Sequence, residues 1–374
     1  MKCRCCNNKD LEQVLSYHNM PSIAQLLPTS PQEAKKLGID LKVYHCHSCN
    51  LIQLDDNAIV PYFKDVIRSS NVSESMTKFR ETQFANFSKY YSLSDRNYLE
   101  VGCGKGEYLE IMEKFISNSV GIENSIEAIH SLRSKNLECV KGFIQDDIDM
   151  KKGSFHAFGT FNFLEHIPRP VEFLRAIRTF LSSDAVGIIE VPNFDMMLKE
   201  HVYSDFSSEH LSYFTTETLT RVIEFSGFNV DSMDVIWHGH ILSAKVSNRK
   251  IPSYHEFEAN LNSSAQKILS ILEKFPKEKV TVWGAGHQSL ATISQLGLES
   301  YIGQIVDSAK QKQNRFSPSS ALPIFSPEWL NEDNTELLLI NVSSYWKEVN
   351  EIVRKKYNFI KYVFIVDNGR IFEV

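Results

Sequence analysis

Four cysteines near the start of this 374-residue sequence have the spacing of a metal site. They form two Cys-x-x-Cys pairs, Cys3 with Cys6 and Cys46 with Cys49. Four thiolates in two such pairs can surround one zinc ion in a tetrahedron and leave no open position for a substrate. We therefore expect a structural zinc site, with Cys5 as a nearby spare thiol.

A glycine loop, Gly102-x-Gly104-x-Gly106, is the second group with the marks of a site. It follows a predicted buried strand that contains Glu100 and precedes a predicted helix. Glycines let the backbone approach a ligand closely, and the helix start adds free N–H groups. The next predicted strand ends at Glu123, where a carboxylate can accept both hydroxyls of a ribose.

Further polar residues follow the third and fourth predicted strands. Asp146 or Asp147 would lie near an adenine amino group, and Asn162 lies at the edge where α/β sheets bind ligands. The loop resembles that of class I S-adenosylmethionine-dependent methyltransferases, whereas a nicotinamide site, the less favoured alternative, more often has G-x-G-x-x-G spacing. The resemblance implies that the cofactor contacts are Glu100, Gly102, Gly104, Glu123, Asp146, Asp147 and Asn162.

Glu209 and His210 are adjacent within "DFSSEHLSYFT" (205–215) and form the third group. A neutral imidazole can take up a proton and release it near neutral pH, so His210 is a candidate base. The alternative is a polar loop between two buried elements. His166, after the fourth strand, is either a second site residue or a satisfied histidine beneath the following helix.

The elements that must position these residues alternate between strand and helix from Asn97 onward, which predicts an open parallel α/β sheet. A second strand, glycine turn and helix begins near 280, with Gly284-x-Gly286 and then Asp307. Taken alone, that turn is typical of a dinucleotide site. The predicted segments are a zinc-binding domain (1–58), a helical connector (59–95), a methyl-donor domain (96–248) and a C-terminal α/β domain (249–374).

The composition is that of a folded globular protein, with 43% hydrophobic and 23% charged residues. A formal net charge of −6, with the basic residues spread along the chain, argues against a nucleic-acid partner. The first residues lack the apolar core of a signal peptide, and no stretch has the length of a membrane span. A cytoplasmic protein with a small-molecule substrate is expected.

Together these parts resemble the three-domain nucleotide-sugar C-methyltransferases that build branched deoxysugars. The resemblance covers nearly the whole chain and also rests on "YHNMPSIAQLL" (17–27), "CNLIQL" (49–54), "RSSNVSESM" (68–76), "EVPNF" (190–194), "EHLSYFT" (209–215) and "VWGAGHQS" (282–289). It implies S-adenosylmethionine and structural zinc as cofactors. It also implies C3 methylation of a nucleotide-linked 4-keto-6-deoxyhexose through an enolate, with His210 as base and Glu209 beside it.

The candidate acceptor contacts, with the diphosphonucleoside expected mainly on the C-terminal domain, are Ser69, Ser70, His166, Tyr213, His240, His287 and Gln288. The chain departs from the family at several of its acceptor positions. Ser207 and Ser208 stand where the family motif has a tyrosine and a histidine, Gln288 where it often has lysine, and His240 where glycine is usual.

Because of these departures from the family motif, two other functions stay open. One is O- or N-methylation of a nucleotide sugar or related metabolite, since many small-molecule O-methyltransferases carry an H-x-x-Y-F-T segment in which Tyr213 belongs to the core. From another class, the chain could be a zinc-stabilised binding module without catalysis.

Overall fold

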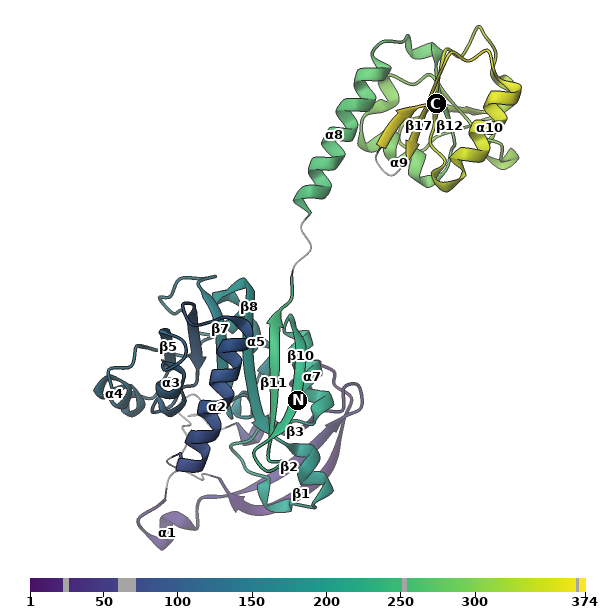
Figure 1. Ribbon diagram of the computed structural model, residues 1–374. Helices are drawn as coiled ribbons and strands as arrows, with labels where there is room; N and C mark the ends of the chain where they lie inside the picture. The colour runs from purple at the N-terminus through teal and green to yellow at the C-terminus, as the bar shows by residue number, and fades with distance from the viewer. Residues whose placement is uncertain (23–26, 60–71, 251–253, 368–369) are drawn as a thin grey trace. The chain divides into compact units, whose positions relative to one another are not determined.

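The computed structural model describes residues 1–22, 27–59, 72–250, 254–367 and 370–374. The chain divides into two compact units, Met1–Lys250 and Ile251–Val374 (Figure 1). Ser69 and Ser70 lie outside the described residues. The predicted division of the first unit into zinc-binding, connector and methyl-donor segments stays a prediction.

The central sheet of the first unit has seven strands in the order β10-β11-β8-β7-β4-β5-β6. Its strands are β4 (Asn97–Val101), β5 (Asn118–Glu123), β6 (Cys139–Lys141), β7 (Phe155–Phe161), β8 (Leu181–Pro192), β10 (Phe228–Ile236) and β11 (Ile241–Asn248). Strands β6, β5, β4, β7 and β8 are parallel, and β10 and β11 form an antiparallel hairpin against β8. The predicted α/β sheet is therefore present. The chain order turns outward in both directions from β4, so a ligand-binding edge is expected where β4 ends.

Helices cover this sheet where the sequence has apolar residues at helical spacing. They are α2 (Glu74–Tyr91), α3 (Glu107–Met112), α4 (Ile126–Ser134), α5 (Pro170–Phe180) and α7 (Thr216–Phe225), whereas α6 (Phe194–Lys199) packs with the N-terminal antiparallel strands described below. Helix α5 begins at Pro170, a residue suited to the first helical turn, and α7 begins with a capping box between Thr215 and Thr218. These starts fix where the loops before α5 and α7 end, and both loops carry candidate site residues.

A four-stranded antiparallel sheet forms the N-terminal part of the chain, in the order β1-β2-β3-β9. Its strands are β1 (Leu11–Pro21), β2 (Gly38–Cys46), β3 (Ile52–Leu54) and β9 (Ser212–Tyr213), and α1 (Pro31–Ala34) lies between β1 and β2 in sequence. Strand β9 comes from the "EHLSYFT" segment, and Tyr213 pairs with Ile52. The candidate catalytic segment is thus built into the sheet that carries the cysteine pairs.

Helix α2 is attached to the sheet by a buried ion pair. Arg80 and Glu190, on β8, are both fully buried, with Nη1 and Oε2 2.6 Å apart. Gln83 and Ser243 donate hydrogen bonds to the other carboxylate oxygen. The Arg80 guanidinium also lies 4.4 Å from the ring centre of Tyr108, a cation–π distance.

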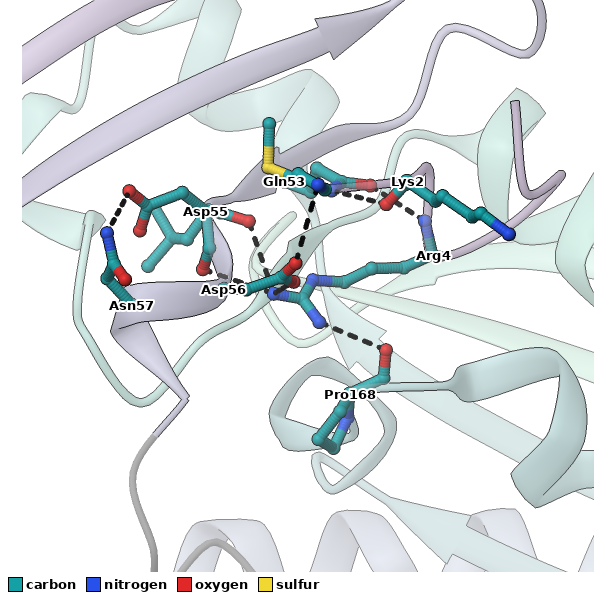
Figure 2. Close-up of polar contacts among 9 residues, drawn as sticks. Lys2, Arg4, Gln53, Asp55, Asp56, Asn57 and Pro168 are labelled. Carbon is teal, nitrogen blue, oxygen red and sulfur yellow. Dashed lines mark hydrogen bonds and ion pairs between the residues drawn. The ribbon is translucent and has the colours of Figure 1, made fainter. Parts of the chain in front are cut away.

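Arg4, between the first pair of cysteines, connects the N-terminal segment to the loop before α5 (Figure 2). Its guanidinium donates to the carbonyl oxygens of Pro168, Leu54 and Asp55 and forms an ion pair with Asp56. The side chain is almost wholly buried, and burial lowers the pKa of the guanidinium, opposed by Asp56 and Asp55. The cysteine segment therefore packs as part of the first unit.

The second unit is a further α/β sheet, in the order β14-β15-β13-β12-β16-β17-β18. Its elements are α8 (His255–Leu272), β12 (Val280–Trp283), α9 (His287–Gln295), β13 (Gln304–Val306), β14 (Arg315–Phe316), β15 (Pro323–Phe325), β16 (Leu337–Ile340), α10 (Trp346–Lys356), β17 (Tyr362–Asp367) and β18 (Arg370–Glu373). The five inner strands are parallel. Among the helices described in either unit, none has the length and apolar content to cross a bilayer.

Candidate active site

The glycine loop joins the end of β4 to α3 in a conformation that favours glycine. Gly102, Gly104 and Gly106 have φ values of +74°, +55° and +82°. A side chain at Gly102 would come within 2.6 Å of the Phe163 ring, whereas at Gly104 only the end of Glu107 lies within 4 Å. The loop therefore leaves open space at Gly104, as a cofactor lying against its backbone requires.

Glu123 ends β5 opposite this loop. Its carboxylate accepts a hydrogen bond of 2.8 Å from the N–H of Gly104, and its other oxygen accepts from the N–H groups of Asn124 and Ser125. The side chain is buried. The carboxylate thus fixes the loop and stays at the strand end, where a ribose would meet it.

A narrow pocket lies at this edge of the sheet. Its lining combines the predicted Gly102 and Glu123 with residues that the sequence reasoning missed, namely Val101, Ile122, Asn124, Gly142, Phe143, Ile144 and Phe163. Apolar side chains and backbone of this kind suit the faces of an adenine ring. Residues that follow β6 do line the pocket, but they are Phe143 and Ile144 and not the predicted aspartates.

The structure does not bring Asp146 and Asp147 to this pocket, because both are exposed and neither contributes to its lining. Glu100 is buried within β4 and also lines no part of it. Asn162 follows β7 with a φ of +48°, and its buried side-chain oxygen has no hydrogen-bond partner among the described residues. A left-handed asparagine with an orphaned amide oxygen at a sheet edge is well placed for a ligand.

Two loops meet at the same edge through paired hydrogen bonds. Nδ1 of His166 lies 2.7 Å from the carbonyl oxygen of Glu209, and the N–H of Leu211 donates to the carbonyl of Glu165 at 2.7 Å. The rings of His166 and His210 meet edge to face, with centroids 4.8 Å apart. The structure therefore brings His166, Glu209 and His210 together.

Both imidazoles are neutral in this environment. Burial lowers the pKa of His166 to about 4. Burial, together with the repulsion that two protonated rings would feel, lowers the pKa of His210 to about 3. Because a carbonyl oxygen only accepts, Nδ1 of His166 carries the proton and Nε2 is the basic nitrogen. That nitrogen lies 3.8 Å from a carboxylate oxygen of Glu165.

Tyr213 and the two serines hold the loop before β9. The Tyr213 hydroxyl accepts from the N–H of Ser207 at 2.9 Å, and its buried ring packs on Phe194 and Phe206. The Ser208 hydroxyl, also buried, donates to the carbonyls of Pro21 and Ser22. These contacts favour a structural role for Tyr213, the alternative that the sequence left open.

His240 lies in the turn between β10 and β11, and its side chain is exposed. Its carbonyl oxygen accepts a hydrogen bond of 2.8 Å from the N–H of Asn193, and the Asn193 side chain donates to Gly239. The backbone of this turn therefore holds the start of α6, whereas the imidazole contributes no contact to the His166 and His210 pair.

The four predicted metal ligands gather at one point. The sulfur atoms of Cys3 and Cys49 are 3.4 Å apart, those of Cys6 and Cys46 are 3.6 Å apart, and all four lie within 4.8 Å of one another. Neighbouring sulfurs around tetrahedral zinc are separated by about 3.8 Å for a Zn–S bond of about 2.3 Å. The donor set and spacing therefore fit zinc without Cys5.

His287 and Gln288 lie in the second unit, at the start of α9. They line a cleft with a volume of about 880 Å³, and one side of α8 also lines it. Its other lining residues include Asn341 and Ser343 after β16, Asp367 at the end of β17 and Arg370 at the start of β18. The cleft opens where β12 and β16 end and the strand order turns in opposite directions, the usual ligand position in such sheets.

Two family models match the chain. Residues 71–233 match a methyltransferase domain, and residues 243–366 match a C-methyltransferase C-terminal domain. The first match contains the glycine loop and His210, and the second contains most of the residues that line the cleft of the C-terminal sheet.

Known proteins with similar sequences include two methyltransferases. The C-methyltransferase NovU of Streptomyces niveus is 21% identical over 96% of this chain and 93% of its own length. The ubiquinone biosynthesis O-methyltransferase of Actinobacillus pleuropneumoniae serotype 7 is 23% identical over 33% of this chain and 56% of its own length. Among solved structures, an S-adenosylmethionine-dependent methyltransferase from Clostridium acetobutylicum ATCC 824 has a TM-score of 0.39 and 14% identity, over 46% of this chain and 92% of that one.

The predicted fold class is confirmed, a class I Rossmann-like methyltransferase core followed by a second α/β domain. S-adenosylmethionine is the methyl donor that this core uses, and the loop, Glu123 and Asn162 fit it. The protein is thus an S-adenosylmethionine-dependent methyltransferase whose second domain is of the kind found at the carboxyl end of C-methyltransferases.

Proposed function

We propose that this methyltransferase transfers its methyl group to C3 of a nucleotide-linked 4-keto-6-deoxyhexose. The observation that carries the proposal is the edge-to-face pair of neutral imidazoles, His166, which is buried, and His210, which is partly buried. His166 comes three residues after Phe163, which lines the proposed donor pocket. The match of residues 243–366 to a C-methyltransferase domain supports carbon as the acceptor, because such a domain accompanies C-methylation.

The proposed chemistry needs one base and one methyl donor. His210 is unprotonated at neutral pH, although its pKa of about 3 makes it a weaker base than a free imidazole. It removes the C3 proton, which the neighbouring ketone has made acidic, and the electron pair of the C–H bond becomes the enolate. Bound S-adenosylmethionine supplies the methyl group, to which C3 forms its new bond as S-adenosylhomocysteine leaves. The imidazolium that forms at His210 would lie edge to face with the neutral His166 ring.

Nucleotide binding is proposed for the cleft of the second unit. His287 and Gln288 begin α9, whose N-terminal N–H groups can face a phosphate, and Arg370 adds a cation to the same lining. The resemblance of the chain to nucleotide-sugar enzymes suggests a diphosphonucleoside as the occupant. We also propose structural Zn²⁺ at the cluster of four cysteines.

The O- or N-methylation alternative has an observation in its favour. Ser207 and Ser208 replace the family's tyrosine and histidine, and both serve the loop rather than the space around His210. Neither position therefore supplies a phenolic hydroxyl that could polarise a sugar ketone. On this alternative, His210 would take the proton of a hydroxyl or amine.

Deuterium exchange distinguishes C-methylation through an enolate from O- or N-methylation. The protein is incubated in D₂O with a nucleotide-linked 4-keto-6-deoxyhexose, with and without S-adenosylhomocysteine, and the sugar is read by NMR. Enolate chemistry predicts exchange at C3 and loss of that exchange in H210N, with donor binding retained. H130N, which removes an exposed histidine on α4, serves as control. Turnover in the wild type without any C3 exchange would favour O- or N-methylation.

A further inference from the structure

The β1–β2 hairpin carries a second group of metal-ligating side chains apart from the cysteine cluster. Glu12 on β1, His45 on β2 and His47 just after β2 place one ligand atom each within 4.8 Å of one another. Glu12 and His47 are exposed and His45 is half-buried, so solvent reaches all three.

Strand geometry explains why these side chains share a face. Glu12 and His45 are directly paired across the antiparallel ladder, so their Cβ atoms are neighbours. Side chains alternate along a strand, so His45 and His47 point one way while Cys46 points the other, into the cysteine cluster. A His-x-His segment opposite a carboxylate is thus presented on the outer side of the same strand end.

The distances suit a transition metal. Nε2 of His47 lies 3.3 Å from a carboxylate oxygen of Glu12, which is close to the spacing of about 3.3 Å between two ligands on tetrahedral zinc with bonds of about 2.0 Å. The rings of His45 and His47 meet edge to face at 5.2 Å. Nε2 of His45 also lies 3.3 Å from the Asn50 side-chain oxygen, a contact that can fix the orientation of a ligating imidazole.

We propose that Glu12, His45 and His47 form a second, solvent-accessible metal site that takes Zn²⁺ or a similar imidazole-binding ion such as Ni²⁺, Co²⁺ or Cu²⁺. Two imidazoles and one carboxylate favour these ions over Mg²⁺ and Ca²⁺, which prefer oxygen ligands. Three protein ligands leave a position open to water or to a further ligand, unlike the four-cysteine cluster. A bound ion would join β1 to the turn after β2.

The test titrates Zn²⁺ into the full chain, whose cysteine cluster has first been loaded and freed of excess metal by gel filtration. The second site predicts one further equivalent by calorimetry, and H47Q or E12Q should weaken its binding by about tenfold or more. Co²⁺ distinguishes the two sites, because thiolate ligation adds strong charge-transfer absorption that this site lacks.

The same hairpin provides a matched control. His18 and Asp40 form another imidazole and carboxylate pair, 3.4 Å apart, without a second imidazole close enough to make a three-ligand group among the described residues. H18Q should leave the further equivalent unchanged. The proposal is overturned if the wild type binds no metal beyond the cysteine cluster, or if H47Q binds the further equivalent as the wild type does.

Discussion

At the scale of single residues, the neighbouring His166 and His210 predict a definite pH response. Burial holds the pKa of His166 near 4 and that of His210 near 3, so neither imidazole should take up a proton between pH 8 and pH 5.5. NMR titration of the ring protons checks this, with assignments from H166N and H210N. A protonation midpoint above pH 6 for either ring would contradict the environment described for that ring.

The same pKa values make stability depend on pH. Because the folded pKa is lower than the ordinary 6.5, the unfolded chain binds the extra proton. The contribution of neutral His166 is complete above about pH 6.5 and is lost as the pH falls toward 4. At pH 5 the loss is about 2 kcal/mol. Urea unfolding of wild type and H166N at pH 7.5 and pH 5 should show a smaller pH difference in the variant.

Single residues of the site were predictable to the extent that their roles depend on local sequence. Gly102 and Glu123 line the proposed donor pocket, and both could be predicted because a glycine turn after one strand and an acid after the next are local patterns. Phe143 and Phe163 were missed, since an apolar residue in a loop resembles any core residue until the sheet edge is built. Tyr213 shows the converse, because only the folded loop reveals that its hydroxyl is already bonded to Ser207.

At the scale of elements, α2 depends on the buried Arg80 and Glu190 pair. R80M leaves a buried carboxylate without its cation and should lower the free energy of unfolding by about 3–5 kcal/mol. K78M on the same helix removes only an exposed ion pair with Glu74 and should change the free energy of unfolding by about 0.5 kcal/mol or less. Urea denaturation measures both variants.

A double variant tests whether the pair itself is responsible. R80M/E190L removes both charges, so it should be less destabilised than the sum of the two single variants. Additive losses would mean that Arg80 acts mainly through its apolar and cation–π contacts with Tyr108.

The pairing of β9 with β3 is the element that the sequence could not indicate. Strand β9 has two residues, too few for any alternation of apolar and polar side chains to stand out. Its partner lies about 160 residues earlier in the chain, as the pairing of Ile52 with Tyr213 shows. By contrast, the seven-stranded sheet follows from long, repeated strand and helix patterns, which is why its fold class was predictable.

At the scale of the whole molecule, the proposed zinc site and the candidate base are parts of one folded unit. Cys46 ends β2 and Cys49 lies in the turn to β3, whose partner β9 directly follows Leu211. Leu51 and the buried cysteines also pack in the same apolar cluster as Phe173 and Phe214 of the methyltransferase core. Ile251–Val374 forms its own sheet and core.

Removal of the proposed metal should therefore loosen the loop that carries the candidate base and leave the second unit unchanged. Metal that holds the two cysteine pairs contributes its binding free energy to folding, so a strong chelator should increase amide exchange at 207–213 by about tenfold or more. Exchange within β12 and β16 is the internal reference. C5S, which alters a buried cysteine outside the four-sulfur cluster, should keep both the metal and the slow exchange. Slow exchange at 207–213 after complete loss of metal would contradict this prediction. It would mean that the pairing of β3 with β9 does not depend on metal at the cysteine cluster.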